Sequence, residues 1–124
     1  MRSLAMFLAA ALWVAPAAWS DEATTLPAGK IELRILYAGH AGSGREKEFV
    51  DFLGQHFKAV QAVELLSFKP DQAEGFDVVL MDYDGDAFKT RFPAIPKTYT
   101  RPTVTLGKAG SMICSQMRLK TGYL

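Results

Sequence analysis

The stretch from residue 30 to residue 60, KIELRILYAGHAGSGREKEFVDFLGQHFKAV, decides the fold class of this chain. It begins with a β-rich apolar run at 31–37, passes through a glycine-rich turn, and restarts with helical spacing. Ser43 and Glu46 have the spacing of a helix capping box. We therefore predict a helix from residue 45 to 60 that packs on the strand by its apolar face, which consists of Phe49, Phe52, Leu53, His56, Phe57 and Val60.

The rest of the chain continues the alternation of strands and helices. Residues 62–68 are predicted as a second strand, and residues 76–82, FDVVLMD, are apolar enough for a central strand that is buried on both faces of a parallel sheet. Proline-rich residues 87–102 are predicted as a loop, 103–106 as a fourth strand, 107–110 as a turn and 111–120 as a final helix. The pattern indicates one α/β domain with a mostly parallel sheet.

The N-terminus has the features of a secretory signal. Met1 and Arg2 give a positive start, residues 4–15 are mostly apolar, and Ala18-Trp19-Ser20 is a small-x-small cleavage site. The alternative is a membrane anchor, but the apolar core is shorter than the ~20 residues that a spanning helix needs. We predict a signal peptide at 1–20, a short linker at 21–29 and a domain at 30–124. The product would be exported, periplasmic or secreted, without stable membrane association after cleavage.

The charge balance argues against a nucleic-acid partner, and the cysteine count argues against an internal disulfide. The chain has 14 Lys and Arg against 13 Asp and Glu, with the basic residues scattered, so we expect no nucleic acid as a partner. Cys114 is the only cysteine, which excludes an intramolecular disulfide. We predict that it is a small buried hydrophobe, with an intermolecular bridge as the alternative.

The glycine-rich turn at residues 39–44 has the glycine spacing of a phosphate-binding loop. Arg45 and Glu46 stand where that motif needs Lys and Ser or Thr, and the order of the glycines does not fit a dinucleotide site. The turn is therefore interpreted as structural, with modest anion affinity at the helix start. We expect no cofactor.

Residues 82–86, DYDGD, follow the predicted central strand and resemble the D-x-D-G motif of haloacid-dehalogenase-type phosphatases and, more faintly, a receiver domain. Both families need further acidic or basic residues that the chain does not supply at the required places. A calcium loop fails as well, because Gly85 comes too early. We interpret Asp82 and Asp84 as groups that bind backbone amides in a turn, with weak cation binding as the alternative.

Two further patterns concern nucleophiles and bases. The strand, turn and helix at residues 102–116 have the order of a nucleophile elbow, but Ala109 occupies the central position, while Ser111 and Cys114 lie on the following helix. His40 is the only histidine in a loop, and a lone histidine is more often structural than catalytic.

Four motifs together resemble the class I glutamine amidotransferase-like superfamily. They are Tyr37-Ala38-Gly39-His40, Arg45-Glu46-Lys47-Glu48-Phe49, Phe76-Asp77-Val78-Val79-Leu80 and Pro102-Thr103-Val104-Thr105-Leu106-Gly107. Within this superfamily, the chain is most similar to the ThuA-like (trehalose utilisation-like) branch, many of whose members are exported. The resemblance covers most of residues 31–123. It implies a flavodoxin-like, three-layer α/β/α fold of about four strands, in which the first strand lies between the second and third.

The same resemblance has consequences for function. Amidotransferases carry a catalytic Cys at the elbow, where this chain has Ala109, and a late His-Glu pair that is absent here, so glutaminase activity is not implied. The chain would correspond to the first half to two-thirds of such a domain. The implied role is non-catalytic binding of a small polar ligand, such as a carbohydrate, or of a partner, at the carboxyl ends of the strands.

The candidate binding residues are Gly39, His40, Gly42, Ser43, Asp82, Asp84, Lys108 and Ser111. One alternative is a hydrolase or metal-assisted phosphatase that uses Asp82 and Asp84, or Ser111, with His40 as the base; it predicts that these groups converge within hydrogen-bond reach. A third hypothesis is a fragment without independent function, which predicts an exposed apolar edge at residues 103–106 and poor solubility.

Overall fold

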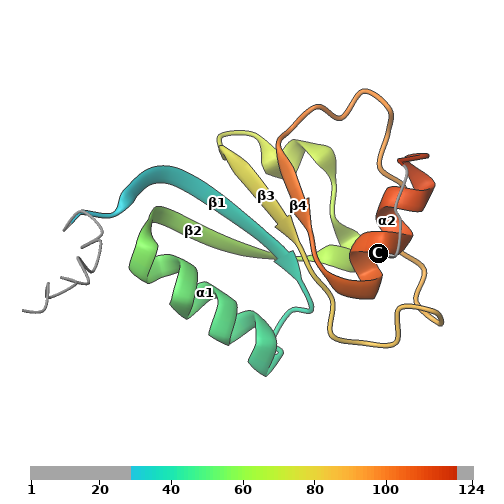
Figure 1. Ribbon diagram of the computed structural model, residues 1–124, viewed down its shortest axis with the longest axis horizontal. Helices are drawn as coiled ribbons and strands as arrows, with labels where there is room; N and C mark the ends of the chain where they lie inside the picture. The colour runs from blue at the N-terminus through green and yellow to red at the C-terminus, as the bar shows by residue number, and fades with distance from the viewer. Residues whose placement is uncertain (1–28, 120–124) are drawn as a thin grey trace, which may run out of the picture.

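The computed structural model describes residues 29–119, which form a sheet of four parallel strands in the order β2-β1-β3-β4 (Figure 1). The strands are β1 (Ile31–Gly39), β2 (Phe57–Glu64), β3 (Val78–Met81) and β4 (Thr103–Thr105). Helices α1 (Gly44–His56) and α2 (Gly107–Gln116) cover opposite faces of the sheet. The predicted flavodoxin-like, three-layer α/β/α fold is confirmed, with β1 between β2 and β3.

The predicted signal peptide at 1–20 lies outside the described residues, as does most of the linker. Within residues 29–119, no helix is both long and apolar enough to cross a membrane.

The start of α1 matches the predicted capping box with one difference. The Ser43 hydroxyl accepts a hydrogen bond from the amide of Glu46 at 3.1 Å. The Glu46 carboxylate accepts from the amide of Gly42 at 3.0 Å, one residue before the cap. The reciprocal pair therefore fixes both the first turn of α1 and the loop that leads into it.

The predicted boundary between the first helix and the second strand is wrong. Helix α1 ends at His56 and β2 begins at the next residue, so Phe57 and Val60 lie in the strand. The two residues pair with Ile31 and Ile35 of β1, and this pairing outweighs an apolar spacing that fits a helix equally well. The predicted strand at 62–68 accordingly starts too late, and its end forms a 3₁₀ helix, η1 (Leu65–Ser67).

Two hydrophobic clusters hold the layers together. The α1 face contains Ile35 and Tyr37 of β1 packed against Leu53. The α2 face is larger, and the segments η1, η2 (Pro70–Ala73) and the β3–β4 connection contribute to it. Its buried residues are Leu36, Ala38, Leu65, Phe68, Ala73, Val79, Met81, Ala87, Phe92, Ala109 and Ile113.

Helix α2 begins four residues earlier than predicted. The predicted turn at 107–110 is its first turn, and only Gly107, with φ of 60°, has a left-handed backbone. Ala109 is buried in the core and does not stand at an exposed apex. A Cβ on Gly110 would lie 2.9 Å from the backbone carbonyl carbon of Thr105, so the close approach of α2 to β4 requires glycine there.

Candidate functional site

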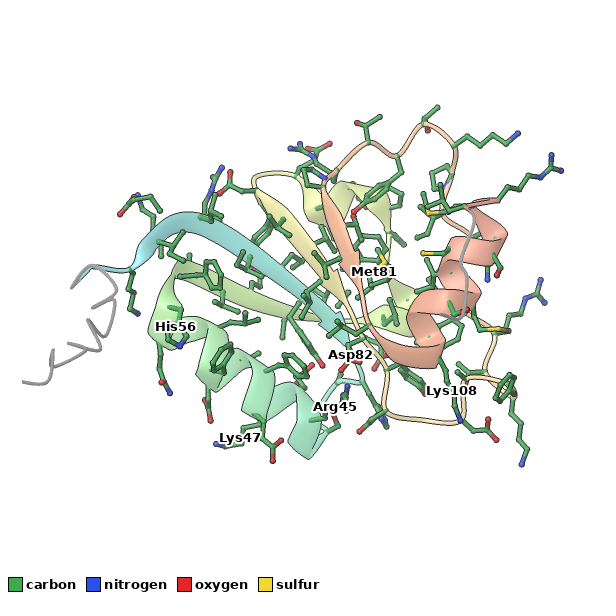
Figure 2. The ribbon with its side chains drawn as sticks, in the orientation of Figure 1. Arg45, Lys47, His56, Met81, Asp82 and Lys108 are labelled. Carbon is green, nitrogen blue, oxygen red and sulfur yellow. The ribbon has the colours of Figure 1, made fainter. Side chains whose placement is uncertain are left out.

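The carboxyl ends of β1 and β3 meet around Asp82, the one charged residue that is buried in the described part of the chain. The Tyr37 hydroxyl donates to Oδ2 of Asp82 at 3.0 Å, and the Arg45 guanidinium forms a bidentate pair with the same carboxylate, at 2.5 Å through Nε and 3.0 Å through Nη2. Figure 2 shows Arg45 next to Asp82 at the start of α1. Asp82 therefore ties β1, β3 and α1 together.

This network changes the protonation behaviour of its members. Burial, followed by the hydrogen bond to Asp82, holds the pKa of Tyr37 well above its ordinary value. The hydrogen bond to Asp82 also raises the pKa of Arg45. Both shifts favour the neutral phenol and the charged guanidinium, which is the state in which the carboxylate has three hydrogen bonds. Asp82, 1% exposed, is thus removed from direct ligand contact, and its role is structural.

The glycine-rich loop at residues 39–44 uses its amides internally. Ala41 donates to the Glu64 carboxylate at 2.9 Å, Gly42 donates to Glu46, and Ser43 donates to the carbonyl of His40 at 3.1 Å. Because two carboxylates and one carbonyl of the chain itself already accept from these three amides, the three do not offer a free anion cradle. Gly42 and Ser43 therefore shape the loop, and Gly39 is buried at the end of β1 beside the Tyr37 ring.

His40 and Asp84 form a second, exposed pair at the same edge. Nδ1 of His40 lies 2.6 Å from Oδ1 of Asp84, although the residues are 44 positions apart, and their side chains are 47% and 32% exposed. The ring of Tyr83 lies beside the imidazole, with 5.3 Å between centroids. With Asp84 ionised, the short contact puts the proton on Nδ1 and leaves Nε2 and Oδ2 of Asp84 facing no hydrogen-bond partner among residues 29–119.

Asp86 of the DYDGD segment and the two remaining predicted site residues, Lys108 and Ser111, have other contacts. Asp86 accepts from the amide of Phe88 at 3.1 Å, as expected for a turn carboxylate. Lys108 lies over the ring of Phe88, at 5.4 Å from its centroid, and the backbone carbonyl of Ser111 accepts from the Ser115 hydroxyl within α2. In the described part of the chain, neither Lys108 nor Ser111 has a hydrogen bond or ion pair with His40 or Asp84.

The arrangement of the side chains at this edge limits which reactions they could carry out. Within the described residues, no group of three or more His, Cys, Asp or Glu side chains is arranged to hold a metal ion. His40 has an orienting carboxylate, yet among these residues no hydroxyl or thiol is within hydrogen-bond distance of its ring. The convergence that the hydrolase hypothesis requires is thus limited to a base and its orienting acid.

Three contributors were missed by the sequence analysis, namely Tyr37, Arg45 and Tyr83. Arg45 was noted only as a departure from a phosphate-binding loop, although an arginine in the first turn of a helix after strand one can reach a carboxylate at the end of strand three. Tyr37 lies shortly before the end of β1, and Tyr83 lies shortly after the end of β3. Because β1 and β3 are neighbours in the sheet, the strand order could have placed both tyrosines at this site.

Comparison with known proteins gives no independent assignment: no protein-family model, no curated protein and no solved structure matches the chain. The resemblance to the ThuA-like branch therefore stays a prediction that depends on the motif residues.

Proposed function

We propose that this chain is an exported, ThuA-like binding domain that recognises a small, hydroxyl-rich ligand, such as a carbohydrate, at the carboxyl ends of β1 and β3. The observation that carries the proposal is the exposed pair of His40 and Asp84. The two residues come from different loops, and neither is needed to satisfy a buried group.

The acceptor atoms of this pair suit a ligand with hydroxyl groups. In the neutral ring Nε2 accepts a hydrogen bond, and Oδ2 of Asp84 is a second acceptor. Two acceptors on adjacent side chains can each take one hydroxyl hydrogen from a sugar or polyol. The Tyr83 ring beside His40 adds an apolar wall, so a few polar groups next to an aromatic surface would fix the ligand's orientation.

The rigid support under the pair favours binding as well. Asp82 precedes Tyr83 and Asp84 directly, and its three hydrogen bonds to Tyr37 and Arg45 anchor the end of β3. On the other side, Glu46 and Glu64 hold the loop that follows His40. A site on loops that are fixed in this way loses little conformational entropy when a ligand binds.

Calorimetric titration with glucose, maltose, trehalose and myo-inositol tests the proposal. We expect at least one of these to bind to the wild-type protein, and His40→Gln and Asp84→Asn each to weaken binding about tenfold, as for the loss of one hydrogen bond in the complex. His56→Gln and Asp51→Asn are matched controls, because they change the same residue types at exposed positions of α1. Binding that is equal in all four variants would overturn the assignment of this site.

The hydrolase hypothesis predicts a different result in the same samples. If His40 acts as a base, the disaccharides would be cleaved by the wild type and not by His40→Gln. Uncleaved trehalose and maltose after prolonged incubation would favour the binding function.

A further inference from the structure

A cavity lies between β4, α2 and the connection that leads from β3 to β4, away from the His40 pair. This cavity has a volume of about 300 Å³. The connection runs around α2 before it returns to β4 (Figure 1). The residues that line the cavity come from this connection, from β3 and β4, and from α2 and the residues after it. Its apolar lining includes Met81, Ile95, Ile113 and Met117.

The cavity also has a polar side. Tyr99, Thr103 and Arg101 line it on the connection and on β4, and the Tyr99 hydroxyl forms a 2.9 Å hydrogen bond with the Thr103 hydroxyl. The Tyr99 ring packs edge-on against Phe68, which fixes this wall of the cavity.

Arg101 is the only charged residue that lines this cavity within the described chain. Its side chain takes part in none of the ion pairs of residues 29–119. Burial raises the pKa of Tyr99, while its hydrogen bond with Thr103 and then the positive charge of Arg101 oppose that rise. An apolar hollow with a free guanidinium at its rim is complementary to an amphipathic anion.

We propose that this cavity binds a small amphipathic carboxylate, with the apolar tail between α2 and the sheet and the carboxylate on Arg101. The volume is roughly twice that of an engineered cavity that holds one benzene ring, so a tail of about eight carbons fits. Octanoate is the simplest probe of this class. A dissociation constant on the order of 100 µM is expected for a ligand of this size.

Cys114 provides a direct reporter of occupancy. It lines the cavity, is half-buried, and lies with its Sγ 3.5 Å from the Thr105 hydroxyl. Because it is the only cysteine in the chain, the rate of alkylation by neutral iodoacetamide measures access to this cavity alone.

The test measures alkylation of the purified full chain with increasing octanoate, and in parallel with octanamide, which has the same tail without the charge. We expect octanoate to slow alkylation at least fivefold in a saturable way and octanamide to require about tenfold higher concentration. Arg101→Gln should remove the difference between the two probes. Arg91→Gln is the matched control on the same connection and should preserve it, since Arg91 lies outside the cavity.

Three results would overturn the proposal. The first is that octanoate does not slow alkylation. The second is equal protection by octanoate and octanamide in the wild type, which would mean that the cavity takes apolar additives without recognising an anion. The third is protection that rises with protein concentration in the absence of any probe, because a second copy of the chain would then cover the cavity. Circular dichroism of both arginine variants checks that the fold is retained.

Discussion

Asp82 is almost completely buried, and the hydrogen bonds from Tyr37 and Arg45 offset the cost of burying its carboxyl group. Asp82→Ala would leave the Tyr37 hydroxyl buried without an acceptor and release Arg45 from the strand end. We expect the free energy of unfolding to fall by about 2–4 kcal/mol, measured by urea denaturation.

The matched control for that change is Asp51→Ala. Asp51 pairs with Lys47 on the exposed surface of α1, at 2.7 Å, and such a pair contributes about 0.5 kcal/mol or less. Equal losses in the two variants would mean that the buried network does not stabilise the fold.

Tyr37 makes the fold sensitive to alkaline pH. Its pKa is raised in the folded state, so the stabilisation is fully present below the unfolded value of about 10 and is lost as the pH rises above it. At pH 11 the expected loss from this one group is roughly 1.4 kcal/mol relative to pH 8. Tyr37→Phe should show a correspondingly smaller decline in its free energy of unfolding over the same interval; a parallel decline would contradict the assignment.

At the level of elements, the two helices differ in whether close packing requires a glycine. A Cβ at Gly110 of α2 would lie 2.8 Å from Cβ of Thr105, whereas one at Gly54 of α1 meets nothing within 4 Å. We expect Gly110→Ala to destabilise the fold by about 1–3 kcal/mol through overpacking, and Gly54→Ala to stabilise it by up to about 1 kcal/mol through helix propensity. Thermal unfolding of both variants checks the pair, and a stable Gly110→Ala protein would show that α2 can move away from β4.

The elements also show what local sequence could predict. The first strand (predicted at 31–37 and observed at 31–39), the capped start of α1, the central strand and the parallel α/β order were predicted from apolar runs, glycines and the Ser43–Glu46 spacing. The end of α1 and the start of α2 were not predicted. At Phe57 the pairing of β2 with β1 sets the boundary, and at Gly107 a single left-handed residue sets it. Neither signal is visible in hydrophobic periodicity.

The candidate site was predicted only in part, because the sequence indicates the order of the strands but not the geometry of the loops. His40 and Asp84 could be placed at one edge by strand order, but their pairing depends on loop geometry, as does the burial of Asp82. A carboxylate after a strand looks the same in sequence whether it faces solvent or an arginine.

For the whole molecule, β4 is an edge of the sheet that pairs with β3 alone among residues 29–119, and its Val104 is 46% exposed. Of the two apolar residues in the segment 103–106, Val104 is exposed and Leu106 is half-buried. An unprotected edge strand promotes association, and a lysine at its centre opposes it. Val104→Lys should therefore reduce aggregation in light scattering at raised protein concentration, with no loss in the unfolding temperature; unchanged scattering would show that this edge does not drive association.

The measurement that tests the central claim most directly is the NMR titration of the two imidazole rings with glucose, maltose, trehalose and myo-inositol. His40 lies in the proposed site and His56 at the far end of α1, where its ring packs against Phe52, so the chain carries its own control. We predict that a bound ligand shifts the His40 resonances in a saturable way and leaves those of His56 unchanged. No shift with any of the four, or equal shifts at both rings, would contradict binding at the carboxyl ends of β1 and β3.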